Sequence, residues 1–172
     1  MGGMHAHVIL AAGQGTRMRS RLPKVLHPLL GKPMLLYALE AALALKPERL
    51  VVVVGHGGEK VVEALEGYPV EVAWQKEQLG TAHALLQAEG LLRDFPGPFL
   101  VTQGDTPLLS PRTLEALLRR VREGAGMALL TAELPDPTGY GRILREGEEV
   151  LGNVEEKDAP PEVRAIREVN AG

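Results

Sequence analysis

Short apolar runs alternate with longer amphipathic runs along most of the chain. The apolar runs are nearly continuous and end at polar or glycine-containing segments, a pattern typical of strands buried in a parallel sheet. The pattern predicts strands at residues 7–12, 50–54, 70–74, 99–102 and 127–132. It predicts helices at residues 34–45, 59–66, 81–92 and 111–123, with Thr81 a candidate cap of the third. This alternation predicts an α/β fold, a Rossmann-like, doubly wound, mostly parallel sheet.

The pattern changes after residue 132. Residues 140–144 and 149–154 predict a β-hairpin that turns around residues 146–148, and residues 160–169 predict a short helix. In doubly wound sheets, ligands bind at the carboxyl ends of the strands. We therefore expect a binding site in the loops that follow residues 12, 54, 74, 102 and 132.

Composition and charge limit the classes of partner. The 172 residues suffice to bury the core of one domain. The net charge of −3 gives no global positive field, so we expect no nucleic-acid partner. The absence of cysteine from this chain excludes disulfides and thiolate metal sites here. No apolar run approaches the roughly 20 residues that span a bilayer, so we expect no membrane partner and a cytoplasmic location.

The five histidines show no pair at a convincing metal-binding spacing. We expect packing or surface roles for all five. His5 and His7 are expected to lie in a mobile terminus.

The loop after the first predicted strand has the chemistry of a polyphosphate site. Gly13 and Gly15 let the backbone approach a ligand, and successive N–H groups in such a turn form a concavity that binds anions. Arg17 and Lys24 add two cations to the same loop. Met18 stands where the dinucleotide fingerprint needs glycine, and the G-K-[ST] ending of a P-loop is absent.

Two further loops carry candidate site residues. Asp105 follows a predicted strand and Gly104, where a carboxylate is a natural magnesium ligand, although a turn or helix-capping aspartate is also common there. Gln75 and Gln78 flank the turn after the third strand, where amide groups can read the edge of a pyrimidine. An ordinary polar loop explains these two glutamines equally well.

Several separated motifs together resemble the sugar-nucleotide pyrophosphorylases. Within them, the sequence is most similar to the bacterial N-acetylglucosamine-1-phosphate uridylyltransferases, and the resemblance runs from residue 8 to residue 172. The first motif marks only the superfamily, whereas the runs at 75–83 and 137–142 are specific for the uridylyltransferase branch. The motifs lie at residues 10–18, 23–26, 55–58, 75–83, 104–108, 136–142 and 154–158.

The resemblance implies a role for each candidate residue. Arg17 and Lys24 would be catalytic, and Asp105 would hold Mg²⁺. Uracil would be recognised by Gln75, Gly80 and Thr81, and the acetamido sugar by Gly141, Glu155 and Asn170. The full set of expected nucleotide- and substrate-binding residues is Leu10, Ala11, Ala12, Gly13, Gly15, Thr16, Lys24, Gln75, Gln78, Gly80, Thr81, Gln103, Gly104, Gly141, Glu155 and Asn170.

The implied reaction joins UTP and N-acetylglucosamine-1-phosphate to give UDP-N-acetylglucosamine and pyrophosphate, for cell-wall precursor synthesis. Three alternatives stay open. A related transferase for another sugar phosphate would share the first loop, and a non-catalytic module would bind a nucleotide sugar without turnover. A dinucleotide-dependent oxidoreductase is disfavoured by Met18.

The chain also departs from the family pattern. Relatives carry a second domain, a β-helix that acetylates glucosamine-1-phosphate and forms their trimer, and its hexapeptide repeats are absent here. A second metal ligand of the family, an asparagine, has no counterpart, and some relatives carry tyrosine where this chain has Gln103. Residues 1–172 are therefore expected to form a nucleotidyltransferase domain that is incomplete at its C-terminus.

Overall fold

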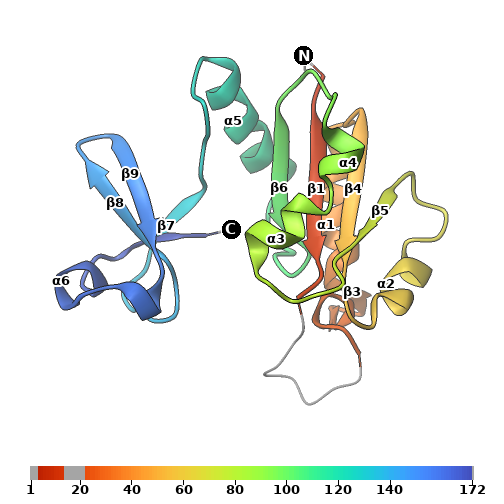
Figure 1. The fold of residues 1–172 in the computed structure, drawn as a ribbon, viewed down its shortest axis with the longest axis horizontal. Coiled ribbons are helices and arrows are strands. Elements are labelled where there is room, and N and C mark those ends of the chain that lie inside the picture. The colour runs from red at the N-terminus through yellow and green to blue at the C-terminus, as the bar shows by residue number, and fades with distance from the viewer. Residues whose placement is uncertain (1–3, 14–21, 172) are drawn as a thin grey trace. The chain divides into compact units, whose positions relative to one another are not determined.

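The structure is a computed structural model that describes residues 4–13 and 22–171. The chain divides into two compact units, Met1–Ala125 and Gly126–Gly172, and Figure 1 colours them in chain order from red to blue. Each unit has its own sheet, and each is described separately below.

A four-stranded parallel sheet forms the centre of the first unit, in the order β5-β4-β1-β6. Its strands confirm four of the predicted ones, with bounds β1 (Ala6–Ala11), β4 (Arg49–Val54), β5 (Glu71–Trp74) and β6 (Phe99–Gln103). The chain steps outward from β1 to β4 and β5, and then crosses to β6 on the other side of β1 (Figure 1). The strand order therefore reverses at β1 and β6, and the crevice outside their carboxyl ends is where such sheets bind ligands.

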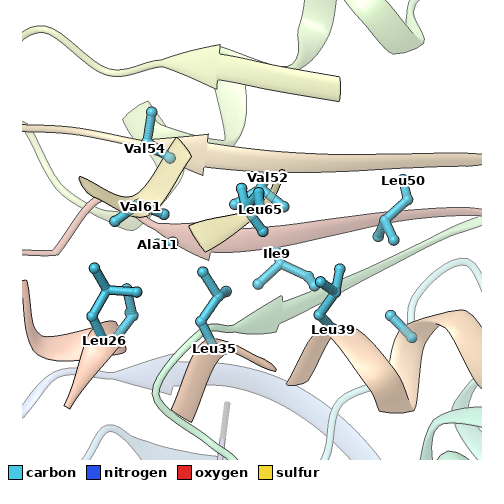
Figure 2. Packing of buried hydrophobic residues seen from close by; sticks show 12 residues of the cluster. Ile9, Ala11, Leu26, Leu35, Leu39, Leu50, Val52, Val54, Val61 and Leu65 are labelled. Atoms are coloured by element: carbon cyan, nitrogen blue, oxygen red, sulfur yellow. The ribbon is translucent and has the colours of Figure 1, made fainter. Parts of the chain in front are cut away.

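Both faces of this sheet are covered, which confirms the doubly wound α/β fold. Ile9 and Ala11 of β1 belong to a buried cluster with Leu35, Leu39 and Val61 from the helices on one face (Figure 2). Val8 and Leu10 point the other way, into a cluster with Ala84 and Ala88. The helices of this unit are α1 (Met34–Ala44), α2 (Gly58–Ala64), α3 (Thr81–Leu86), α4 (Glu89–Leu92) and α5 (Pro111–Arg122), with a 3₁₀ turn η1 (Lys24–Leu26) and a small hairpin of β2 (Pro28–Leu29) and β3 (Lys32–Pro33).

The helix predicted at residues 81–92 is wrong in one respect, because it is broken after Leu86. The side-chain amide of Gln87 donates to the carbonyl of His83 over 2.9 Å, while its backbone N–H bonds Ala84 instead. This competition for the His83 carbonyl tightens the turn and separates α3 from α4. Thr81 is not the cap: Gly80 occupies that position, with no side-chain capping bond.

The second unit is built on an antiparallel sheet in the order β7-β10-β8-β9. The predicted hairpin is confirmed as β8 and β9. The elements are β7 (Thr131–Glu133), β8 (Arg142–Glu146), β9 (Glu149–Val154), η2 (Glu156–Asp158), α6 (Pro161–Arg164) and β10 (Glu168–Asn170).

Two predictions about this region need correction. The expected fifth parallel strand at residues 127–132 is wrong, since only Thr131–Glu133 forms a strand and it pairs antiparallel with β10. Ala132 therefore lies within a strand of the antiparallel sheet, and no loop follows it at the end of a parallel strand. The helix expected at 160–169 shortens to α6, because Val169 belongs to β10, where it lies between β7 and β8.

The expectation that His5 and His7 lie in a mobile terminus is also wrong. Both side chains are buried, and His7 lies within β1. The imidazole of His7 is 2.8 Å from the hydroxyl of Thr102 on β6. The packing role expected of these histidines is confirmed.

Candidate functional site

The predicted catalytic lysine and the predicted metal ligand meet in the structure. Lys24 lies on the loop after β1, and Asp105 lies on the turn after β6. Their side chains form an ion pair, with Lys24 Nζ 2.8 Å from Asp105 Oδ2. The pair marks the end of the two strands at which the strand order reverses, where a ligand site is expected.

Apolar packing holds these two loops together. Val25 and Leu26, which follow Lys24, are buried and fix the η1 turn against the core. A β-carbon on Gly104 would lie 3.0 Å from Val25 Cγ1 and 3.3 Å from Leu35 Cδ1. Glycine at position 104 therefore lets the η1 turn approach the end of β6 closely, and this approach brings Lys24 to Asp105.

The Lys24–Asp105 ion pair is weak enough for another cation to replace the Lys24 ammonium group at Asp105. The side chains of Lys24 and Asp105 are 46% and 29% exposed, and such partly solvated pairs contribute only about 0–1 kcal/mol. The ammonium group therefore occupies a cation position on Asp105 Oδ2 without being held tightly there.

The residues present fit a hard divalent cation held largely by its substrate. No group of three or more His, Asp or Glu side chains in residues 4–13 and 22–171 is placed so that it could hold a metal ion. A cation such as Mg²⁺ is often bound by one or two carboxylates, with phosphates and water as its other ligands. Asp105 supplies one carboxylate of this kind, already placed beside a positive charge.

The predicted base-reading loop is organised around Gln75. This residue directly follows β5, its side chain is buried, and its backbone N–H donates to Val54. Its Nε2 lies 3.2 Å from the carbonyl of Gly80 and 2.9 Å from Nδ1 of His83. Gly80 has φ +102, a conformation that favours glycine, and it turns the chain into α3. Three of the predicted residues, Gln75, Gly80 and Thr81, therefore lie around one turn.

Gln78 lies beside the ends of β1 and β4. A β-carbon on Gly55 would be 2.7 Å from Gln78 Nε2 and 2.8 Å from the carbonyl oxygen of Ala12. The missing side chain at position 55 thus makes room for the Gln78 amide next to the end of β1. Gly55 is a further candidate site residue that the sequence predictions did not include, and its position directly after a strand was the available signal.

The predicted residues at the end of β1 offer main-chain groups rather than side chains. The side chains of Leu10, Ala11 and Ala12 are buried in the core, and the carbonyl of Leu10 accepts from the N–H of Gly104. Gly13 is exposed. The predicted residues Gly15, Thr16 and Arg17 lie outside the described residues. Gln103 ends β6, and its carbonyl accepts from the hydroxyl of Thr106 over 2.9 Å, which shapes the turn that carries Asp105.

In the second unit, the three predicted sugar-binding residues come together. The backbone N–H of Asn170 donates to the carbonyl of Gly141 over 3.0 Å. The side-chain amide of Asn153 fills the space that a β-carbon on Gly141 would need, and it donates to Glu155 over 3.0 Å. Asn153 therefore joins Gly141, Glu155 and Asn170 in one polar cluster. Sequence reasoning missed it, since an asparagine in a hairpin strand carries no signal of its own.

Arg142 and Glu156 connect the chain segments next to this cluster. The guanidinium of Arg142 is 2% exposed and donates to Glu156, to the carbonyl of Tyr140 and to the carbonyl of Arg164. The backbone N–H of Gly139 donates to Glu156, and this bond together with that from Arg142 lowers the pKa of the Glu156 carboxyl below its ordinary value. These bonds link the loop before β8 to the loop after β9.

Fold and candidate site together define an α/β domain with a charged candidate ligand site at the switch point of a parallel sheet. The chain belongs to the family of MobA-like NTP transferase domains, which its sequence matches over residues 7–159.

The chain is also similar in sequence to individual curated proteins. The chain is 55% identical over 168 residues to the bifunctional protein GlmU of Syntrophotalea carbinolica and 54% identical over 169 residues to that of Pelotomaculum thermopropionicum. Each alignment covers 97% of this chain but only 36% and 37% of the relative. The chain thus spans about a third of the length of these relatives.

Solved structures share the fold. A UDP-glucose pyrophosphorylase complexed with UDP-glucose matches 99% of this chain and 75% of its own, with a TM-score of 0.81 at 22% identity. A nucleotidyl transferase from Methanothermobacter thermautotroptrophicus matches 87% of this chain and 69% of its own, with a TM-score of 0.59 at 29% identity. Within the part of the chain that is described, no helix has the length and apolar character needed to cross a membrane.

Proposed function

We propose that this chain is a uridylyltransferase unit that joins UTP and N-acetylglucosamine-1-phosphate to give UDP-N-acetylglucosamine and pyrophosphate. The reaction would supply cell-wall precursors, and we place it in the cytoplasm. The observation that carries the proposal is the pairing of Lys24 with Asp105 at the switch point of the sheet. The identity of 54–55% to the bifunctional GlmU proteins supports the choice of reaction.

The proposed chemistry is an in-line transfer. The phosphate of the sugar-1-phosphate attacks the α-phosphorus of UTP, a P–O bond forms, and the bond to pyrophosphate breaks. The attacking group is already an anion, so catalysis requires positioning and neutralisation of charge rather than a strong base. Bound Mg²⁺ would supply charge neutralisation on the phosphates, with Asp105 as its protein ligand.

The cations of the first unit have separate roles in this proposal. Amides of residues 13–16 cradle the triphosphate, and Arg17 stabilises the charge on the departing pyrophosphate. Lys24 contacts Asp105 when no substrate is bound, and it turns to the substrate phosphates when they arrive. The weak, partly exposed ion pair supports this exchange, because little free energy is lost when it opens.

The recognition groups follow the same assignment. Gln75, Gly80 and Thr81 would recognise uracil in the first unit, with Gln78 and the main chain of Ala12 and Gly13 beside them. In the second unit, Gly141, Glu155 and Asn170 would contact the N-acetylglucosamine moiety. The hydrogen bond between Asn170 and Gly141 and the packing of Asn153 on Gly141 support this grouping.

A calorimetric titration tests the proposal. The chain is titrated with UDP-N-acetylglucosamine, UDP-glucose and GDP-mannose in the presence of Mg²⁺. We expect UDP-N-acetylglucosamine to bind most tightly. A preference for GDP-mannose would assign the chain to another nucleotide, and absence of binding to all three would contradict the proposal.

Matched variants connect this binding to the cation site. Asp105→Asn should remove the Mg²⁺ dependence of binding. Asp94→Asn makes the same chemical change at an exposed position at the end of α4 and should leave it unchanged. Equal behaviour of the two variants would contradict the role of Asp105.

A further inference from the structure

The orientation of the Gln75 side chain can be assigned from its neighbours. The carbonyl oxygen of Gly80 can only accept hydrogen bonds, and it lies 3.2 Å from Gln75 Nε2. If the amide were turned over, two carbonyl oxygens would face each other there. The NH₂ group of Gln75 therefore points toward Gly80.

This orientation fixes the role of His83. The second N–H of the Gln75 amide is directed to Nδ1 of His83, 2.9 Å away, so Nδ1 is the acceptor. The neutral imidazole then carries its proton on Nε2, because the 2.9 Å contact of Nδ1 with Gln75 is the shorter one, and the Gln87 amide nitrogen, 3.4 Å from Nε2, already donates to the His83 carbonyl. Both donors of Gln75 are consumed inside the protein, one by a backbone carbonyl and one by an imidazole.

The only group of the Gln75 amide left to bind a ligand is its oxygen, which is an acceptor. Its Oε1 makes no hydrogen bond within the described residues, and although the Gln75 side chain is buried, this oxygen is not among their fully enclosed unpaired atoms, so it keeps some access for a ligand donor. Uracil presents an N–H donor at N3, whereas cytosine presents a lone pair there. If the Gln75 amide cannot rotate, its Oε1 accepts a hydrogen bond from N3–H of uracil but repels the lone pair on N3 of cytosine.

We infer that His83 is a positioning residue that selects the base, by holding the Gln75 amide with its oxygen toward the ligand. The inference rests on the proposed function, because it takes Gln75 as the residue that reads the base. In this role His83 acts on the base through Gln75 rather than by a contact of its own. Without Nδ1 of His83, one Gln75 N–H loses its acceptor, and only the Gly80 carbonyl then opposes rotation of the amide. A rotated amide would present N–H groups to the ligand, and these can donate to the N3 lone pair of cytosine. Thymine has the same edge as uracil, so the device discriminates uracil and thymine from cytosine.

Three variants separate positioning from packing. His83→Leu removes the acceptor. His83→Asn keeps one, because the asparagine Oδ1 can take the place of Nδ1. Gln87→Ala serves as the control: Gln87 donates to the His83 carbonyl and lies 3.4 Å from Nε2, so its loss disturbs the same turn but leaves Nδ1 in place.

The readout is the ratio of the dissociation constants of CDP and UDP, measured by calorimetry on the whole chain, with thermal unfolding measured in parallel. We expect a preference for UDP in the unmodified chain. His83→Leu should reduce this ratio about five- to tenfold, the effect of one lost hydrogen bond, while His83→Asn and Gln87→Ala should retain it.

The outcomes distinguish the two hypotheses. If His83→Leu weakens UDP and CDP equally, His83 has only a structural role, and the inference is overturned while the proposed function stands. If His83→Asn loses the preference as fully as His83→Leu, the Nδ1 acceptor is not the relevant group, and the inference is likewise overturned. If the unmodified chain does not prefer UDP, the proposed uridylyl specificity fails together with the inference.

Discussion

Acid should destabilise the first unit through one buried histidine. His7 lies in β1, at the interior of the parallel sheet, and its side chain is fully buried. Its Nε2 bonds Thr102, and its Nδ1 has no partner within the described residues. Burial, with a smaller contribution from neighbouring His5, lowers the pKa of His7 from 6.5 to about 3. The folded chain therefore keeps this imidazole neutral at pH values where the unfolded chain protonates it.

The size and direction of the effect follow from proton linkage. The folded pKa lies below the unfolded pKa of 6.5, so the unfolded state binds more protons between pH 6.5 and about 3, and stability falls as the pH falls. At pH 5, His7 lowers the free energy of unfolding by about 2 kcal/mol, because each pH unit below 6.5 contributes about 1.4 kcal/mol. That loss is a large part of a typical stability of about 5–15 kcal/mol.

Comparison with His7→Gln isolates the contribution. Glutamine can keep the bond to Thr102 but does not titrate. Urea unfolding of both chains, followed by the fluorescence of the single tryptophan, Trp74, gives the free energy of unfolding at pH 7.5 and pH 5.0. The pKa values of the Glu156 and Glu168 carboxyls are also shifted, but downward from 4.5, so the stability that they add is lost only as the pH falls below about 4.5. We expect the unmodified chain to lose about 2 kcal/mol more than His7→Gln over this interval. Equal losses in the two chains would refute the reasoning.

Three further predictions concern the two candidate sites. Gly104→Ala should lower the free energy of unfolding by about 1–3 kcal/mol, because the new methyl group meets Val25 and Leu35; an unchanged melting temperature would contradict this packing. Lys24→Met should tighten the binding of Mn²⁺ to the nucleotide-free chain a few-fold, since a cation no longer competes for Asp105. Water-proton relaxation measures this affinity, and weaker Mn²⁺ binding would argue against the exchange. Asn153→Ala should reduce the affinity for UDP-N-acetylglucosamine but not for UDP, as measured by calorimetry. Equal losses of affinity for the two ligands would show that Asn153 does not take part in sugar recognition.

Local signals were sufficient to predict the parallel sheet. Each of its four strands is an apolar run that ends at a polar loop, and the structure confirms all four. The strand expected at residues 127–132 failed because its partner is not local. Thr131–Glu133 pairs with Glu168–Asn170, and nothing in the apolar run itself specifies an antiparallel partner so far along the chain.

The candidate site was predictable residue by residue, but its assembly was not. Lys24 and Asp105 each stood out by charge and by position after a strand. Their contact depends on the pairing of β1 with β6 and on the close approach that Gly104 permits. The contact between Gln75 and His83 likewise requires the positive φ of Gly80, a backbone property that no residue pattern displays alone.

The central claim is that this chain transfers a uridylyl group with Asp105 at its cation site. The most direct test is pyrophosphate release on mixing the chain with UTP, N-acetylglucosamine-1-phosphate and Mg²⁺, compared with Asp105→Asn and Asp94→Asn. We predict release that requires both substrates, persists in Asp94→Asn and is lost in Asp105→Asn. Binding of UDP-N-acetylglucosamine without any release of pyrophosphate would contradict the claim and indicate a nucleotide-sugar binding module instead.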